Sequence, residues 1–94
     1  MNVADLDIAC FERIMTGIKT FDIVFVFRAY EKGWIRVESI DREHLQPIQA
    51  WLNSKNVLFF QVASTLMWKN MLFTIMRDFR AFVHEGGWSK LMTE

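Results

Sequence analysis

The spacing of the apolar residues changes at Thr20, and this change most constrains the fold of the chain. Residues 21, 23, 25 and 27 are all large and apolar, at the period of two that places side chains on one face of a strand. A second run of strand character covers 34–40, after the short segment 31–33. Gly33 can adopt the left-handed conformation that a three-residue hairpin loop requires. The sequence therefore predicts an antiparallel hairpin of two strands.

The segments on either side of this hairpin show the spacing of helices. In residues 3–16 the apolar positions fit one helix face, and Gly17 follows as a stop signal; they are Val3, Leu6, Cys10, Phe11, Ile14 and Met15. After the hairpin, Asp41 can cap a second helix whose apolar positions are Leu45, Ile48 and Leu52. Because Pro47 is disfavoured deep inside a helix, we expect the regular part to begin near residue 44 or 45.

The last third of the chain predicts one more strand and one long helix. Residues 57–63 are apolar at consecutive positions, as in a strand covered on both faces. From about Ser64 to His84 the apolar residues form one continuous helical face; they are Trp68, Met71, Leu72, Ile75, Met76, Phe79, Phe82 and Val83. Gly86 and Gly87 then end the helix.

Together these elements predict a small α+β fold with the order α-β-β-α-β-α. A right-handed crossover places the third strand parallel to the second. The expected structure is a three-stranded mixed sheet with strand 20–28 in the centre and helices packed against it. We expect residues 1–94 to form a single compact domain, in which 85–94 is a C-terminal tail.

One face of the predicted hairpin carries residues typical of binding surfaces. A three-residue loop pairs Tyr30 with Trp34 and Arg28 with Arg36. Arginine and aromatic residues dominate the binding energy of protein interfaces, and they also suit nucleic-acid strands. Alternatively, the two arginines are solvated or neutralised by nearby acidic residues, because opposed like charges cost at most about 1 kcal/mol. The face therefore predicts contact with a partner, with a solvated sheet face as the alternative.

A second candidate surface lies on the long helix and the tail. Away from the apolar face, one line carries Lys69, Phe73, Arg77, Arg80 and His84, which could contact an acidic surface or a nucleic-acid backbone. The alternative is a solvated helix face. In the tail, Trp88, Leu91 and Met92 stand at helical spacing. They either fold back as a lid on the helix or anchor the chain in a groove of a partner, so Trp88 joins the predicted partner-binding residues.

The composition argues that some apolar surface is covered by another molecule. The hydrophobic fraction is 52%, with nine Phe and four Trp, and the formal net charge is zero. A chain of this size buries only about 60–65% of the surface that its unfolded form exposes. Because a protein with zero net charge has little charge repulsion to keep it soluble, its solubility depends on covering the apolar surface. These features predict a protein partner and a homodimer. Neither a membrane span nor a secretion signal is predicted, so we expect a cytoplasmic protein.

No residue pattern predicts catalysis. Cys10 lies on the apolar side of the first predicted helix and is interpreted as a buried, unreactive thiol. Asp7 is interpreted as a first-turn acid, with a buried functional acid as the alternative. His44 and His84 lack partners at metal-ligand spacing. We therefore predict no enzyme, no metal, no cofactor and no small-molecule substrate; an enzyme using either histidine with a carboxylate is a remote third option.

The resulting hypothesis is a non-catalytic protein-interaction module. It would bind and modulate a larger protein through the Arg and aromatic sheet face, as an accessory factor or inhibitor of the kind encoded by phages or plasmids. The alternative is a nucleic-acid-binding protein that uses the basic and aromatic residues of the hairpin and of the last helix.

Overall fold

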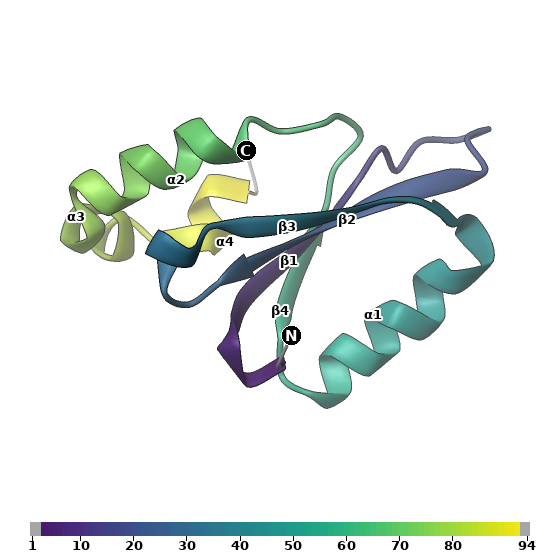
Figure 1. Ribbon diagram of the computed structural model, residues 1–94, viewed down its shortest axis with the longest axis horizontal. Helices are drawn as coiled ribbons and strands as arrows, with labels where there is room; N and C mark the ends of the chain where they lie inside the picture. The colour runs from purple at the N-terminus through teal and green to yellow at the C-terminus, as the bar shows by residue number, and fades with distance from the viewer. Residues whose placement is uncertain (1–2, 93–94) are drawn as a thin grey trace.

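The computed structural model describes residues 3–92. Four strands and four α-helices follow one another along the chain, separated in places by short 3-10 turns (Figure 1). In chain order they are β1 (Leu6–Glu12), β2 (Thr20–Phe27), β3 (Trp34–Asp41), α1 (Leu45–Ser54), β4 (Leu58–Gln61), α2 (Trp68–Arg77), α3 (Phe79–His84) and α4 (Gly87–Met92). The 3-10 turns are η1 (Val3–Asp5), η2 (Tyr30–Lys32) and η3 (Arg42–His44).

The four strands form one mixed sheet in the order β3-β2-β1-β4. β1 is antiparallel to β2 and parallel to β4, and β2 is antiparallel to β3. The predicted α+β class with a mixed sheet and helices is therefore confirmed. The prediction of three strands in the order α-β-β-α-β-α is wrong. A fourth strand, β1, lies between β2 and β4, so β2 is not the only central strand.

The missing strand is β1, which the apolar spacing assigned to a helix. Six of its seven residues are buried, including both Ala9 and Cys10 on opposite faces of the sheet. A strand covered on both faces needs no polar alternation, so its apolar run also fits a helical period. Residues 6–12 form a strand because their backbone N–H and C=O groups pair with both neighbouring strands, β2 and β4.

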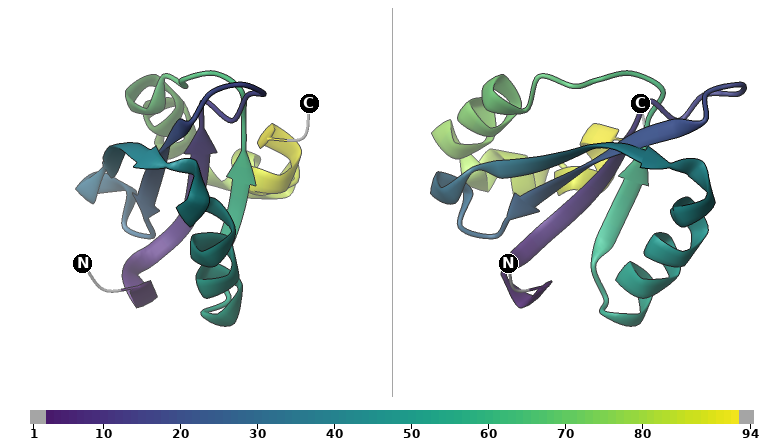
Figure 2. Two further views of the ribbon diagram at one scale, coloured as in Figure 1. Left: turned by 90° about the vertical axis from the view of Figure 1, so that its right-hand side faces the viewer. Right: turned by 45° about the vertical axis from the view of Figure 1, so that its right-hand side comes forward.

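Each face of the sheet carries its own hydrophobic core. On one face, α1 packs over a cluster that includes Phe11, Phe21 and Leu52. On the other face, the C-terminal arm, by which we mean α2, α3 and α4, packs over a cluster that includes Val24 and Trp68. Figure 2 shows α1 and the arm on opposite sides of the sheet. The protein is thus a three-layer structure, 38 Å in its longest dimension.

Helix α1 forms as the sequence predicts and ends in a well-defined cap. It begins at Leu45, and Pro47 stands in its first turn, where a missing N–H costs nothing. At its end Asn56 adopts a φ of 58°, the left-handed conformation that closes a Schellman motif. The Val57 N–H donates to the Leu52 carbonyl at 3.0 Å. Both side chains are buried in the α1 core, which fixes the turn from α1 into β4.

The hairpin of β2 and β3 exists, but its register differs from the prediction. Trp34 lies opposite Val26 rather than Tyr30, a displacement of four residues. The predicted pairs Arg28 with Arg36 and Tyr30 with Trp34 are therefore wrong. The loop is longer than three residues because η2 forms inside it, and its Gly33 N–H donates to the Tyr30 carbonyl at 2.9 Å. From Ile23 to Val26 the displacement is even, so these side chains keep their predicted faces. Beyond an irregularity between Phe21 and Ile23 it becomes odd, and Ile40 lies opposite Phe21 on the α1 side of the sheet.

The edge strand β3 is only partly covered. Ile35 and Val37 lie opposite the buried Phe25 and Ile23, yet they are 42% and 44% exposed. Both face the α1 side of the sheet, while α1 covers the residues nearer β1. β3 pairs with β2 alone within the described residues, so this edge leaves apolar side chains in solvent.

The predicted long helix is divided in two at Asp78. This residue has φ −147° and ψ 78°, which no helix continues through, and its Oδ1 accepts the Ala81 N–H at 3.1 Å. Asp78 therefore caps α3 while α2 ends at Arg77. No helix among the described residues is long and apolar enough to cross a membrane.

Candidate protein-docking surface

Helix α2 attaches the arm to the sheet through three apolar residues. Trp68, Leu72 and Ile75 recur at four and three positions, so they share one helix face. They are 1%, 3% and 4% exposed and contact the core formed by Val24 and Val26. The arm is therefore held by apolar burial along one side of α2.

A buried carboxylate fixes the start of the arm. Glu12, at the end of β1, is fully buried. Its Oε2 accepts the Leu66 N–H at 2.6 Å and the Trp68 indole N–H at 3.0 Å, and its Oε1 accepts Nε of Arg36 at 3.0 Å. Arg36 also donates to the Leu66 carbonyl at 3.4 Å. The side chain of Glu12 thus joins β1, β3 and the segment leading into α2.

A second polar cluster holds the end of the arm. Trp88 of α4 donates from its indole N–H to Oδ2 of Asp7 at 2.8 Å and to the Tyr30 hydroxyl at 3.0 Å. The Tyr30 hydroxyl in turn donates to Oδ2 of Asp7. Burial, and then this hydrogen bond, raise the pKa of Tyr30 well above its usual range. Trp88 therefore packs on the body, as the lid alternative predicts; the side chain of Met92 lies outside the described part.

The residues predicted on the hairpin face contact the rest of the chain. Arg36 stacks over the Trp34 ring at 5.1 Å and is tied to Glu12. Nε of Arg28 donates to the Leu6 carbonyl at 3.1 Å. Tyr30 and Trp34 are half-buried against the arm core, and Trp88 is buried within it. Their role in binding a partner stays a prediction, but the arm itself occupies much of the face that they share.

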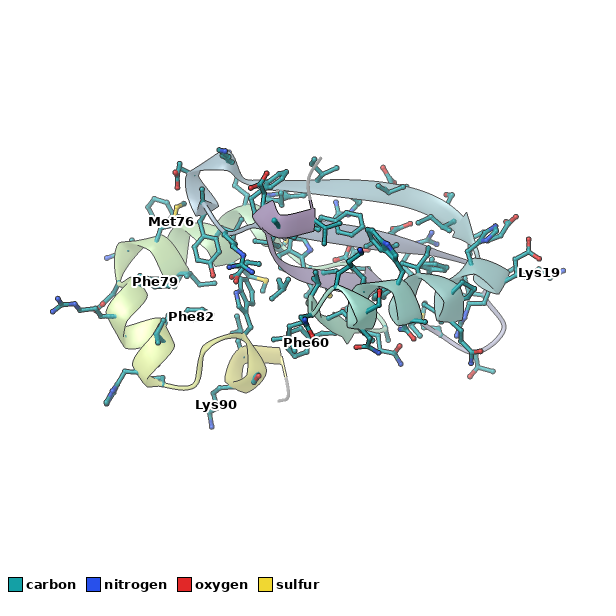
Figure 3. All side chains as sticks on the ribbon, turned by 90° about the horizontal axis from the view of Figure 1, so that it is seen from below. Lys19, Phe60, Met76, Phe79, Phe82 and Lys90 are labelled. Atoms are coloured by element: carbon teal, nitrogen blue, oxygen red, sulfur yellow. The ribbon has the colours of Figure 1, made fainter. Side chains whose placement is uncertain are left out.

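Four exposed apolar side chains lie on α2 and α3 of the arm. We call this group the arm stripe and define it as Phe73, Met76, Phe79 and Val83, which are 61%, 46%, 50% and 55% exposed. Phe73 and Met76 are three positions apart on α2 and share a face. Met76 and Phe79 line one cleft beside Tyr30, and Phe79 and Val83 line an open hollow of about 660 Å³ on α3. Figure 3 shows Met76 and Phe79 at the end of the molecule far from Lys19.

The predicted basic line does not form one straight row. Lys69, Phe73 and Arg77 lie on α2, whereas Arg80 and His84 lie on α3 beyond the break at Asp78. All five are exposed. The break brings Arg80 and His84 beside Phe79 and Val83 around the α3 hollow, together with the acidic Asp78. The surface is therefore apolar with mixed charge, and its use as a contact site stays a prediction.

A deeper groove runs between the three helices of the arm. It measures about 360 Å³ and is lined by residues of α2, α3 and α4 and the turns between them. Phe82 lies in its wall and contacts Trp88, with ring centroids 5.3 Å apart. Leu91, 43% exposed, forms the α4 side. Through Phe82 the groove thus lies next to the buried side chain of Trp88.

The other reactive groups of the described residues are a buried thiol and an exposed cluster of metal-ligating residue types. Cys10 is fully buried, as expected, and burial, followed by the charge of Glu12, raises the pKa of its thiol to about 12. Asp41, Glu43 and His44 are the one close group of metal-ligating types between residues 3 and 92, and all three are exposed. An exposed group of this kind is common without an ion.

The sequence reasoning missed the two carboxylates that organise the arm. Asp7 was interpreted as a first-turn acid of a helix, and Glu12 was not singled out. Both stand in the run that forms β1, where acids among consecutive apolar residues on a buried strand must find donors. That signal becomes visible only when residues 6–12 are assigned to a strand, since on a helix both acids could reach solvent.

Comparison with known proteins gives one family over most of the chain. Residues 1–61 match the family model described as histone chaperone Rttp106-like, middle domain. The chain belongs to this family.

The relatives of this histone chaperone family member come from distant eukaryotes. The FACT complex subunit SPT16 of Dictyostelium discoideum is 38% identical over 94 residues, which is 100% of this chain and 9% of the relative. The subunits of Aspergillus fumigatus and Arabidopsis thaliana are 33% and 30% identical over 96% and 97% of this chain, and it covers 9% and 8% of them. The chain thus spans less than a tenth of these relatives.

Membership of the family corrects several predictions. An accessory factor or inhibitor from a phage or plasmid is wrong, and so is the nucleic-acid-binding alternative, because the match is to a histone chaperone family. The predicted cytoplasmic localisation is also wrong, because the chain belongs to a histone chaperone family and its relatives are SPT16 subunits of the FACT complex. A protein partner agrees with a chaperone family. Homodimerisation, the absence of catalysis and the single-domain boundaries stay predictions.

Proposed function

We propose that this chain is a histone-binding part of an SPT16-type FACT subunit and that it contacts core histones through the arm stripe. The proposal is supported by the family match over residues 1–61 and by the similarity to SPT16 subunits along the whole chain. The observation that carries the choice of surface is the exposure of Phe73, Met76, Phe79 and Val83 on one side of the arm. Clustered large apolar side chains in solvent mark interaction sites.

The physical character of the stripe indicates how such a contact would be stabilised. Arg77 and Arg80 stand beside Asp78 and Glu85 around the stripe, so this surface has no strong net charge. Histones are strongly basic, and an arm without an acidic excess cannot attract them mainly through charge. We therefore expect burial of the aromatic and aliphatic side chains to dominate, with weak dependence on salt.

Binding of fluorescently labelled core histones, supplied as their separate purified heterodimers, tests this proposal. Phe73→Ser and Val83→Ser remove the two most exposed members of the stripe. If they are hot-spot residues, each variant should bind at least one histone heterodimer about 5- to 30-fold more weakly than the wild type.

The matched control is Leu58→Ser, because Leu58 is 48% exposed but lies on β4, away from the stripe. This variant should bind histones as the wild type does. Equal affinities for all three variants would refute the arm stripe as the binding surface. Absence of histone binding by the wild type would refute the proposed function itself.

A further inference from the structure

Helix α4 is joined to the rest of the arm by a turn that only glycine adopts easily. Gly86 and Gly87 have φ values of 112° and 62°, a range that disfavours residues with a Cβ atom. The helix that follows has six residues. Isolated helices shorter than about 12 residues are marginal in water. α4 therefore depends on its contacts with the body to remain folded.

Those contacts centre on one side chain. Trp88 is 6% exposed, whereas Ser89, Lys90 and Leu91 are exposed. Its ring lies against those of Tyr30, Trp68 and Phe82, with centroids 6.2, 6.1 and 5.3 Å away. We call this site the Trp88 socket. Its walls are aromatic and its base carries the Asp7 carboxylate, which accepts the indole N–H.

We propose that α4 is a latch, which swings out at Gly86 and Gly87 while the sheet stays folded and thereby frees the Trp88 socket for a histone side chain. This inference rests on the proposed histone-binding function. The occupant that fits is an aromatic residue with a hydrogen-bond donor at its tip, because Trp88 itself has that chemistry and Asp7 accepts its donor. In the closed state Trp88 is an internal competitor for this occupant.

The latch lies beside the arm stripe, which gives it access to the same partner. Phe79 of the stripe contacts Tyr30 of the socket at a centroid distance of 5.8 Å, and Phe82 contacts both Phe79 and Trp88. A histone bound on the stripe would therefore lie next to the socket. The socket binds a histone side chain only when α4 is open. The apparent dissociation constant of the socket for that side chain therefore equals its intrinsic value divided by the fraction of molecules in which α4 is open.

Gly86→Ala tests the latch without altering any residue of the socket. A Cβ at this position would lie 2.7 Å from Cβ of Lys90, on a backbone with φ of 112°. The substitution therefore disfavours the closed position of α4. Gly17→Ala is the matched control, because Gly17 also has a positive φ, 86°, but a Cβ there meets nothing within 4 Å.

Amide hydrogen exchange reports the opening directly. In the wild type, amides of residues 87–91 should exchange at least about 10-fold faster than those of β1 and β2, as a separate opening unit. In Gly86→Ala they should exchange faster still, with β1 and β2 still protected, while Gly17→Ala leaves them unchanged. Exchange of residues 87–91 at the same rate as the sheet would overturn the latch.

Histone binding by the same variants tests the competition. Gly86→Ala should bind histones more tightly than the wild type. Its dissociation constant should fall by about the same factor by which amide exchange of residues 87–91 accelerates. Trp88→Ala, checked for a protected sheet, should also bind more tightly because the competitor is gone. Unchanged or weaker binding by both variants would overturn the regulatory role of the socket. If neither the wild type nor any variant binds histones, the proposed function fails, and the exchange rates alone decide whether α4 opens.

Discussion

Arg36 on the edge strand and Glu12 on β1 form an ion pair across the intervening strand β2. Nε of Arg36 lies 3.0 Å from Oε1 of Glu12, although the two strands are not neighbours in the sheet. Val24 of β2 stands opposite Arg36 on one side and opposite Cys10 on the other. The pair thus lies over the strand between them, beneath the segment that leads into α2.

Replacing the buried carboxylate should weaken the attachment of the arm. Glu12→Gln keeps one acceptor oxygen, but its NH₂ group must face either the donor of Arg36 or those of Leu66 and Trp68. We expect the free energy of unfolding to fall by about 3–5 kcal/mol, the range for breaking a buried ion pair. Denaturant titration measures this loss. Glu38→Gln, at an exposed position on β3, should change stability by less than about 0.5 kcal/mol; equal effects would contradict the role of Glu12.

The pair of Arg13 and Asp22 predicts a loss of stability in acid. Arg13 donates to both carboxylate oxygens of Asp22, at 3.0 and 2.8 Å, and holds its pKa below the usual range. A lowered folded pKa stabilises the protein above the unfolded pKa of about 3.9, and this contribution is lost as the pH falls through the folded value. Unfolding titrations at descending pH should show a steeper decline for the wild type than for Asp22→Asn.

Exposed Asp41 provides the comparison for this pH effect. Asp41→Asn should retain the acid dependence of the wild type, because that carboxyl accepts no such pair of bonds from Arg13. Parallel pH curves for the wild type and Asp22→Asn would show that the ion pair contributes nothing.

Truncation of two adjacent residues of α2 should reduce stability to very different extents. Leu72 is 3% exposed in the arm core, whereas Phe73 is 61% exposed on the arm stripe. Leu72→Ala leaves a cavity and should cost about 2–5 kcal/mol of unfolding free energy. Phe73→Ala should cost less than about 0.5 kcal/mol. Thermal or denaturant unfolding compares them, and a larger loss for Phe73 would mean that α2 is rotated relative to this structure.

The thiol of Cys10 should be unreactive until the protein unfolds. Its pKa of about 12 leaves little thiolate at neutral pH, and the side chain is fully buried. A raised folded pKa gives stability that is complete below the unfolded pKa of about 8.5 and is lost as the pH rises toward the folded value. Wild type should therefore lose stability relative to Cys10→Ala above about pH 8.5.

Reaction with a chromogenic disulfide reagent checks the same residue kinetically. Modification at pH 8 should proceed at the rate of unfolding and accelerate with denaturant. Rapid stoichiometric modification of the folded protein would contradict the buried position of Cys10.

Local signals in the sequence determined several elements before any contact was known. Alternation placed β2, and Pro47 placed the start of α1 near residue 44 or 45, where the helix begins at Leu45. Within the predicted apolar face of residues 64–84, Trp68, Leu72 and Ile75 are buried, whereas Met76, Phe79 and Val83 are exposed. Each of these signals concerns residues within one turn or one strand. Short-range sterics and one-sided burial are enough to produce them.

Contacts between distant residues decided the rest. β1 is a strand because β2 and β4 both pair with it, and nothing inside its seven residues distinguishes that outcome from a helix. The hairpin face was expected to meet another molecule, yet Glu12 and Asp7 draw the arm onto it through donors 54 to 81 residues away in the sequence. Periodicity in the sequence indicates which residues are buried. Only the tertiary structure shows which residues they pack against, because those residues lie far away along the chain.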